Sequence, residues 1–156
     1  MKTQFLLPTR FKKLGLCMLI PFVIMAAFQW FGGMDLLPYT YWELPLPAIY
    51  DDPIVGGGKW FTIVKESIYE EIWIIGLLLS LTFIALAKEK DEDEMISKIR
   101  LESMAWALWV TVVLFALETL WVFGFVYMKT TFLTLFIYLI IFIAKFNYEM
   151  YKLKRD

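Results

Sequence analysis

The sequence predicts an all-α integral membrane protein, a four-helix bundle with both chain ends on the cytoplasmic side. Three observations support this prediction: a large apolar excess, four long apolar stretches, and basic residues concentrated on one side of those stretches. Of the 156 residues, 60% are hydrophobic and the mean hydropathy is +0.64, whereas soluble domains contain about 45–50% apolar residues. A chain this short has little interior, so the excess predicts contact with lipid.

The four stretches predict the spans of a single membrane domain covering residues 1–156. A helix needs about 20 mostly apolar residues to cross the hydrocarbon layer. We expect spans at about residues 14–31, 72–87, 104–127 and 131–146. Pro21 lies inside the first span, where we expect it to kink the helix. Residues 128–130 separate the last two spans, which predicts a tight antiparallel helical hairpin there.

The distribution of lysine and arginine predicts the orientation. Only Lys59, Lys65 and Lys129 fall on the expected outer side, whereas the other twelve of the 15 basic residues fall in the N-terminal tail, the second loop and the C-terminal end. The positive side of a membrane protein faces the cytoplasm, so both termini are expected there. We expect the first span to be retained, since its apolar stretch is long for a signal peptide and Met25-Ala26-Ala27 is a poor cleavage site.

The outer segment 32–71 is expected to have two parts. Residues 32–59 are rich in proline and glycine, which disfavours both helix and sheet, yet they are too apolar for a solvated linker. We expect this loop to lie on the outer interface, with a lid or ligand-contact surface as the alternative. Residues 60–71 carry an apolar stripe, Ile63, Val64, Ile68 and Tyr69, interrupted by charged side chains, which indicates an amphipathic helix at the outer interface.

The inner connection, residues 88–103, is predicted to be a charged cap. Seven charged residues run in a row from Lys88, and a helix then leads into the third span. Asp91 and Asp93 suit the helix N-terminus, and Lys98 lies four residues from both Glu94 and Glu102. Such a cap stabilises a hairpin, or it docks a cytoplasmic protein. The candidate docking residues are Asp91, Glu92, Asp93, Glu94, Lys98, Arg100 and Glu102.

The same segment carries a resemblance. The stretch AKEKDEDEMISKIRLESMAWALWV is similar to a pattern in small multi-span bacterial inner-membrane proteins that have no assigned function. The matching residues are Lys88, Glu89, Lys90, Glu92, Asp93, Glu94, Ile99, Arg100, Leu101, Glu102, Ser103, Trp106 and Ala107. The resemblance implies a multi-pass protein of the bacterial inner (plasma) membrane, and it implies no chemistry.

One acidic side chain lies inside a predicted span, and such a residue is a functional hypothesis by default. Counted from the outer ends of the expected spans, Glu118 lies at a depth similar to those of Ser80, Thr82 and Tyr138. These four residues could form an intramembrane polar cluster. Its role would be either a proton- or cation-linked site or hydrogen bonding between helices.

The composition narrows the function classes. The chain has no histidine and one cysteine, which removes the commonest general base and metal ligand and any internal disulfide. We therefore expect no catalytic residues, no metal and no cofactor, and the charge pattern indicates no nucleic acid partner.

Three functions remain after these exclusions. The favoured one is a non-enzymatic accessory, sensor-like or complex-forming subunit in the lipid bilayer, with a protein partner at the cap or a homo-oligomer. The alternatives are a small proton- or cation-linked transporter or channel using Glu118, and a membrane-embedded enzyme acting on lipid.

Overall fold

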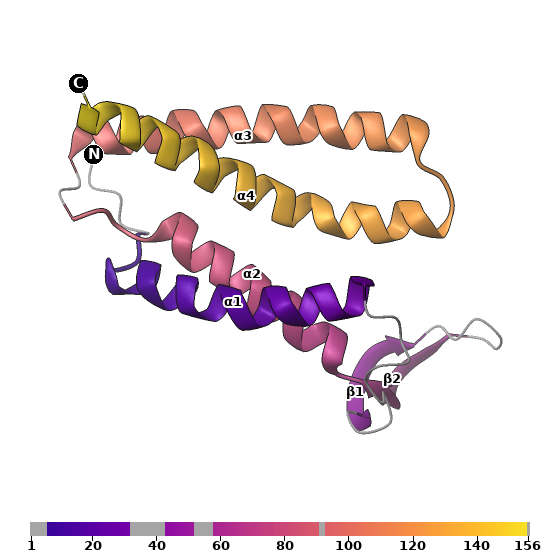
Figure 1. Cartoon of the computed structure of the whole chain (residues 1–156). Helices are drawn as coiled ribbons and strands as arrows, with labels where there is room; N and C mark the ends of the chain where they lie inside the picture. Colours follow the sequence, from indigo (N-terminus) through magenta and orange to yellow (C-terminus); the bar gives the residue numbers. More distant parts are fainter. Residues whose placement is uncertain (1–5, 32–42, 52–57, 91–92, 156) are drawn as a thin grey trace. The chain divides into compact units, whose positions relative to one another are not determined.

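The computed structural model describes residues 6–31, 43–51, 58–90 and 93–155, and these residues are mostly helical (Figure 1). The chain divides into two compact units, one containing residues up to Leu19 and from Leu78 onward, the other Ile20–Leu77. The elements are α1 (Arg10–Phe31), β1 (Glu43–Asp51), β2 (Lys59–Ser67), α2 (Tyr69–Leu86), α3 (Glu94–Trp121) and α4 (Phe125–Arg155).

The four helices confirm the expectation of four candidate spans. Each contains a segment long and apolar enough to cross a membrane, namely Arg10–Gln29, Tyr69–Leu86, Glu94–Trp121 and Thr130–Arg155. Most of their apolar surface is uncovered, and in α1 only 6% of the most apolar window is buried. Helices of a water-soluble domain bury their apolar side against a core, so these surfaces suit a lipid environment.

The helices α1 and α2 approach closely at two glycines, one in each unit. A Cβ atom on Gly15 would lie 2.8 Å from the carbonyl oxygen of Ser80 and 2.9 Å from Cγ1 of Ile84. In the other unit, the ring of Phe22 lies so close to Gly76 that a Cβ atom there would clash with it. Small residues allow membrane helices to approach in this way, which strengthens van der Waals packing between them.

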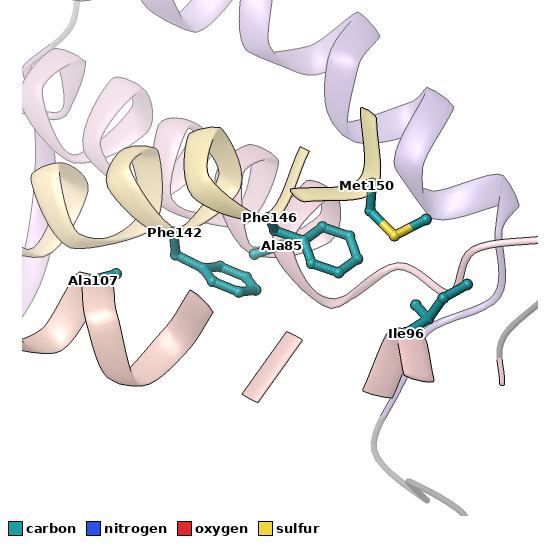
Figure 2. Close-up of a cluster of buried hydrophobic side chains, with 6 residues drawn as sticks. All are labelled: Ala85, Ile96, Ala107, Phe142, Phe146 and Met150. Carbon is teal, nitrogen blue, oxygen red and sulfur yellow. The ribbon is translucent and has the colours of Figure 1, made fainter. Parts of the chain in front are cut away.

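The helices α3 and α4 form an antiparallel hairpin whose core includes the end of α2. Figure 2 shows this cluster. Its buried members come from α2 (Ala85), α3 (Ile96 and Ala107) and α4 (Phe142, Phe146 and Met150). Ala107 is fully buried and Phe142 is 1% exposed, so a small side chain on α3 provides the space that a large ring on α4 fills.

The turn between α3 and α4 lies earlier than expected. The sequence reading placed it at residues 128–130, but α3 ends at Trp121 and α4 begins at Phe125. Gly124 adopts a φ of +75°, a conformation that glycine tolerates without steric cost. The polar pair Lys129-Thr130 indicates the later turn, whereas Gly124 provides the positive φ that the observed turn uses.

The predicted amphipathic helix at residues 60–71 is wrong, and so is the prediction that residues 32–59 avoid sheet. The strands β1 and β2 form an antiparallel hairpin in which Leu46 faces Val64 and Ala48 faces Thr62. The half-buried residues Leu46, Ala48, Thr62 and Val64 recur every second position, which is the period of a strand. The β-branched run Thr62-Ile63-Val64 favours this geometry over a helix.

The prolines of β1 are compatible with the hairpin because of their spacing. Pro45 and Pro47 are two residues apart, so the positions without N–H groups fall on the same edge of the strand. Among the described residues β1 pairs with β2 alone, which leaves the other edge to accommodate them. Residues 32–42 and 52–57 of the expected outer loop lie outside the described residues.

The close approach at Gly15 predicts that Gly15→Ala destabilises the protein although alanine favours helix. The added methyl group meets backbone of α2, and overpacking of this kind costs about 1–3 kcal/mol, more than the helix propensity gain of about 1 kcal/mol. The thermal unfolding midpoint in detergent micelles measures the effect. Leu16→Ala, at an exposed site on the same helix, is the matched control and should lower the midpoint less. An unchanged or raised midpoint for Gly15→Ala would contradict the contact.

Candidate functional site

Four segments of one unit are joined by contacts at what we call the basic end, which comprises the N-terminus of α1, the C-terminus of α2, the N-terminus of α3 and the C-terminal part of α4. The segment before α1 attaches through the backbone. The N–H of Leu7 donates to the carbonyl of Leu86 at 2.9 Å, and the N–H of Lys88 donates to the carbonyl of Leu7 at 2.8 Å. A helix end leaves carbonyls without partners, and Leu7 provides one of them with a donor.

A side-chain ion pair strengthens the same attachment. The ammonium group of Lys12 in α1 contacts the carboxylate of Glu89, just beyond α2. Both side chains are partly covered, with 31% and 20% of their surfaces exposed. The partial burial reduces screening by salt relative to a fully exposed pair.

Arg100 lies at the centre of the basic end and is 5% exposed. Its two terminal nitrogens donate to the carbonyls of Ala85 at 3.0 Å and Ala87 at 3.3 Å. The guanidinium carbon lies 4.5 Å from the centroid of the Phe146 ring. The C-terminal end of a helix carries partial negative charge, so the guanidinium of Arg100 stabilises the end of α2. The same side chain of α3 also packs on α4.

The planar guanidinium suits this position better than a lysine would. It presents several donors in a fixed fork and stacks on aromatic faces, whereas an ammonium is a strongly hydrated point charge. The sequence reading placed Arg100 among the docking candidates and missed this role. The sequence signal for this buried role is the helical spacing of Arg100 with Ile96, Ser103 and Ala107, which are all buried.

The other docking candidates separate into three groups. Asp93 is the N-cap of α3, as expected, and its carboxylate accepts from the backbone N–H of Ile96 at 2.7 Å. Asp91 and Glu92 lie outside the described residues. Glu94, Lys98 and Glu102 lie on exposed positions of α3, and Lys98 and Glu102 form a loose ion pair at 3.9 Å.

An exposed stripe of α3 combines two of these charges with apolar side chains. We call Met95, Lys98, Leu101 and Glu102 the α3 stripe; at 100° per residue these four lie within about 120° of one another around the helix. Met95 is 56% exposed and Leu101 is 69% exposed. The stripe lies on the side of α3 opposite to the buried residues Ile96, Arg100 and Ser103, so the packed interior holds it in a fixed orientation.

The predicted intramembrane cluster does not assemble around Glu118. The earlier turn places Glu118 in the last turn of α3, where its carbonyl accepts from the N–H of Val122 at 2.8 Å. Glu118 lies 18 residues beyond Arg100, about 27 Å along the helix. Ser80 lies about 8 Å along α2 from Ala85, which Arg100 contacts. Glu118 and Ser80 are therefore too far apart to interact directly.

The remaining members of that cluster have other surroundings. Ser80 is fully buried, and its carbonyl faces Gly15 of α1. Tyr138 packs beside the buried cluster of Figure 2, and Thr82 is half-buried. The depth estimate failed because it was counted from a turn at residues 128–130.

The interior face of α3 is more polar than its outer face. Ser103 and Thr111 are buried there, and one carboxylate oxygen of Glu118 is also covered. Within the described part of the chain, the hydroxyls of Ser103 and Thr111 and this oxygen, Oε1 of Glu118, have no hydrogen-bond partner. The outer side carries Trp109, Val112 and Val113, all more than half exposed. This is the polarity expected for helices surrounded by lipid.

Lys145 is held by residues of α4 and α3. Its ammonium group bonds the carboxylate of Glu149 at 2.6 Å and lies 5.4 Å from the centroid of the Trp106 ring. The aliphatic part of a lysine covers apolar surface while its charged end reaches a polar group. Lys145 therefore anchors this end of α4.

Comparison of the chain with protein-family models, curated proteins and solved structures finds no match. Among the described residues there is no group of three or more Cys, Asp or Glu side chains that could hold a metal ion. The candidate site joins a packed basic end to the exposed α3 stripe.

Arg100→Leu is expected to destabilise the protein by about 2–4 kcal/mol, because it leaves the buried carbonyls of Ala85 and Ala87 without donors. Arg100→Lys should recover only part of the loss, since lysine cannot reproduce the fork. Unfolding in detergent micelles measures both variants. Lys98→Leu, at an exposed position two residues away, is the control and should change stability by less than about 0.5 kcal/mol. Equal stability of Arg100→Leu and the parent would show that Arg100 does not hold the basic end together.

Proposed function

We propose that the protein is a non-enzymatic subunit of the bacterial inner membrane that binds a protein partner through the α3 stripe. The observation that supports this most directly is the exposure of Leu101 at 69% and Met95 at 56% on a helix segment that precedes the apolar part of α3. Apolar side chains bordered by charges, on a surface outside the hydrocarbon layer, are typical of interaction sites.

The orientation in this proposal follows from the basic residues. Arg100, Lys12 and the basic last turn of α4 all belong to the basic end, and positively charged ends face the cytoplasm. Both termini and the α3 stripe would then be cytoplasmic. The partner would present an apolar contact for Leu101 and Met95, with charges complementary to Lys98 and Glu102.

The fixed orientation of the stripe favours binding. The helix carrying it is capped by Asp93 and held by Arg100 on its opposite side. A surface ordered before binding loses less conformational entropy when the partner docks. The resemblance to small bacterial inner-membrane proteins is consistent with this role and adds no partner identity.

A proton- or cation-linked transporter using Glu118 is the second candidate. The covered carboxylate oxygen without a partner among the described residues favours it. The place of Glu118 in the last turn of α3 disfavours it, because a coupling carboxylate is expected near the middle of the membrane. The subunit role therefore remains the leading proposal.

Site-specific photocrosslinking in native membranes tests the subunit role. Benzoylphenylalanine replacing Leu101 is expected to crosslink one discrete protein, and Lys98→Glu together with Glu102→Lys should reduce that crosslink several-fold by reversing both charges. Benzoylphenylalanine replacing Trp109, 72% exposed on the same side of α3 but inside the span, is the matched control and should not capture the protein. Glu118→Gln should leave the crosslink unchanged.

Two results would contradict the subunit role. One is the absence of any crosslink at Leu101 in a protein that is inserted and expressed normally. The other is a loss of proton uptake by cells carrying Glu118→Gln with the crosslink intact, which would favour the transporter.

A further inference from the structure

The β-hairpin formed by β1 and β2 exposes large apolar side chains. Ile49 and Trp60 are each 69% exposed, Ile63 is 73% exposed and Phe61 is 82% exposed. Pro47 is directly opposite Ile63, so both lie on the same side of the hairpin and extend this exposed surface. We call Pro47, Ile49, Phe61 and Ile63 the apolar hairpin surface.

Phe61 has an unusual backbone conformation. Its φ is +52°, in the left-handed region that non-glycine residues seldom adopt. The regular pairing of the strands is interrupted at this point, because Ala48 pairs with Thr62 and Tyr50 with Trp60, with no pair between them. Such conformations persist where the surroundings compensate for the strain, and an aromatic side chain left in water would add to the cost.

The chain gives the hairpin little freedom to leave the membrane surface. β2 ends at Ser67 and α2 begins at Tyr69, so a single residue separates the strand from a candidate span. One residue reaches at most about 3.6 Å. The hydroxyl of Tyr69 donates to the carbonyl of Met25 at 2.9 Å. This bond holds the C-terminal part of α1 next to the start of α2.

The composition of the hairpin matches the boundary between acyl chains and headgroups. The rings of Tyr50 and Trp60 pack with their centroids 4.8 Å apart, and Trp and Tyr concentrate at this boundary in membrane proteins. Lys59 and Lys65 are exposed on β2, where their ammonium groups could reach lipid phosphates. A two-stranded hairpin is only marginally stable in water, so it gains most from a surface that covers its apolar side chains.

We propose that the apolar hairpin surface lies in the lipid interface of the outer leaflet, with Phe61 and Ile63 reaching the acyl chains. Lipid is the occupant because β2 leads within one residue into α2, whose exposed Ile75 lies within the candidate span Tyr69–Leu86. The hairpin is then a membrane-surface element that fixes the depth of α1 and α2. The proposal rests on the insertion of α2 and does not depend on a partner at the α3 stripe.

Immersion depths of nitroxide labels test the proposal on the full chain in nanodiscs of phosphatidylglycerol and phosphatidylcholine. Cys17 is the chain's one cysteine and is exposed, so labels are placed in a Cys17→Ser background at Phe61→Cys, Ile63→Cys and the half-buried Thr62→Cys. Ile75→Cys is the lipid reference and Lys154→Cys the water reference. Each label's collision rate with oxygen is divided by its rate with a water-soluble nickel chelate, since oxygen partitions into lipid and the chelate does not.

The proposal expects the ratio at Phe61 and Ile63 to exceed that at Lys154 and Thr62 and to approach that at Ile75. A ratio equal to the Lys154 value, with Ile75 still in lipid, would overturn it and place the hairpin in water. Protection from both reagents would overturn it in favour of a protein surface, including a second copy of the chain. A water-like ratio at Ile75 would instead refute the insertion of α2.

A double substitution tests whether the labels themselves cause the measured immersion. Phe61→Ser and Ile63→Ser together, read by a label at Tyr50→Cys, should shift the Tyr50 ratio toward the water reference. Thr62→Ser, which changes a half-buried position, should leave it unchanged. An unchanged ratio after the double substitution would contradict immersion of the apolar hairpin surface.

Discussion

The structure depends on one buried cation. The guanidinium of Arg100 completes the C-terminal end of α2, stacks on Phe146 of α4 and belongs to α3. A charge at 5% exposure is costly unless it is hydrogen-bonded, and here both terminal nitrogens donate to carbonyls that the end of α2 leaves open. The same interaction orients α3 so that the opposite side of its first turns, the α3 stripe, is exposed. The interaction that packs these helices therefore also exposes the surface for which we propose a function.

The second constraint is the solvent that the helices require. Ser103, Ala107 and Thr111 lie on the interior side of α3, whereas Trp109 and Val113 lie outside. This arrangement is unfavourable in water and favourable in lipid, where helices associate through small and polar residues because apolar contact with lipid is equally good. The glycines that bring α1 and α2 together follow the same rule. The proposed position of the hairpin at the interface would extend this adaptation, because its apolar side chains are exposed next to a candidate span.

The sequence predicted the helices well and the connections poorly. Four apolar stretches identify four helices because length and composition alone decide them, and Asp93 was predicted as a cap from a local backbone rule. The turn at Gly124 and the strand at residues 59–67 differ from the expectation, because their signals, the glycine and the β-branched run Thr62-Ile63-Val64, are local backbone preferences that the search for apolar spans does not weigh. The sequence makes Arg100 a docking candidate, because only the folded chain shows which carbonyls its guanidinium reaches. The grouping of Glu118 with Ser80 failed as a consequence of the misplaced turn.

We propose that the basic end held by Arg100 faces the cytoplasm while the hairpin faces outward. Labelling of single cysteines with a membrane-impermeant maleimide in intact cells tests it most directly, using Lys59→Cys in the hairpin and Lys152→Cys near the end of α4, both in a Cys17→Ser background. The account predicts that Lys59→Cys reacts in intact cells and that Lys152→Cys reacts only after the membrane is permeabilised. Reaction of Lys152→Cys in intact cells, or protection of Lys59→Cys until permeabilisation, would contradict it.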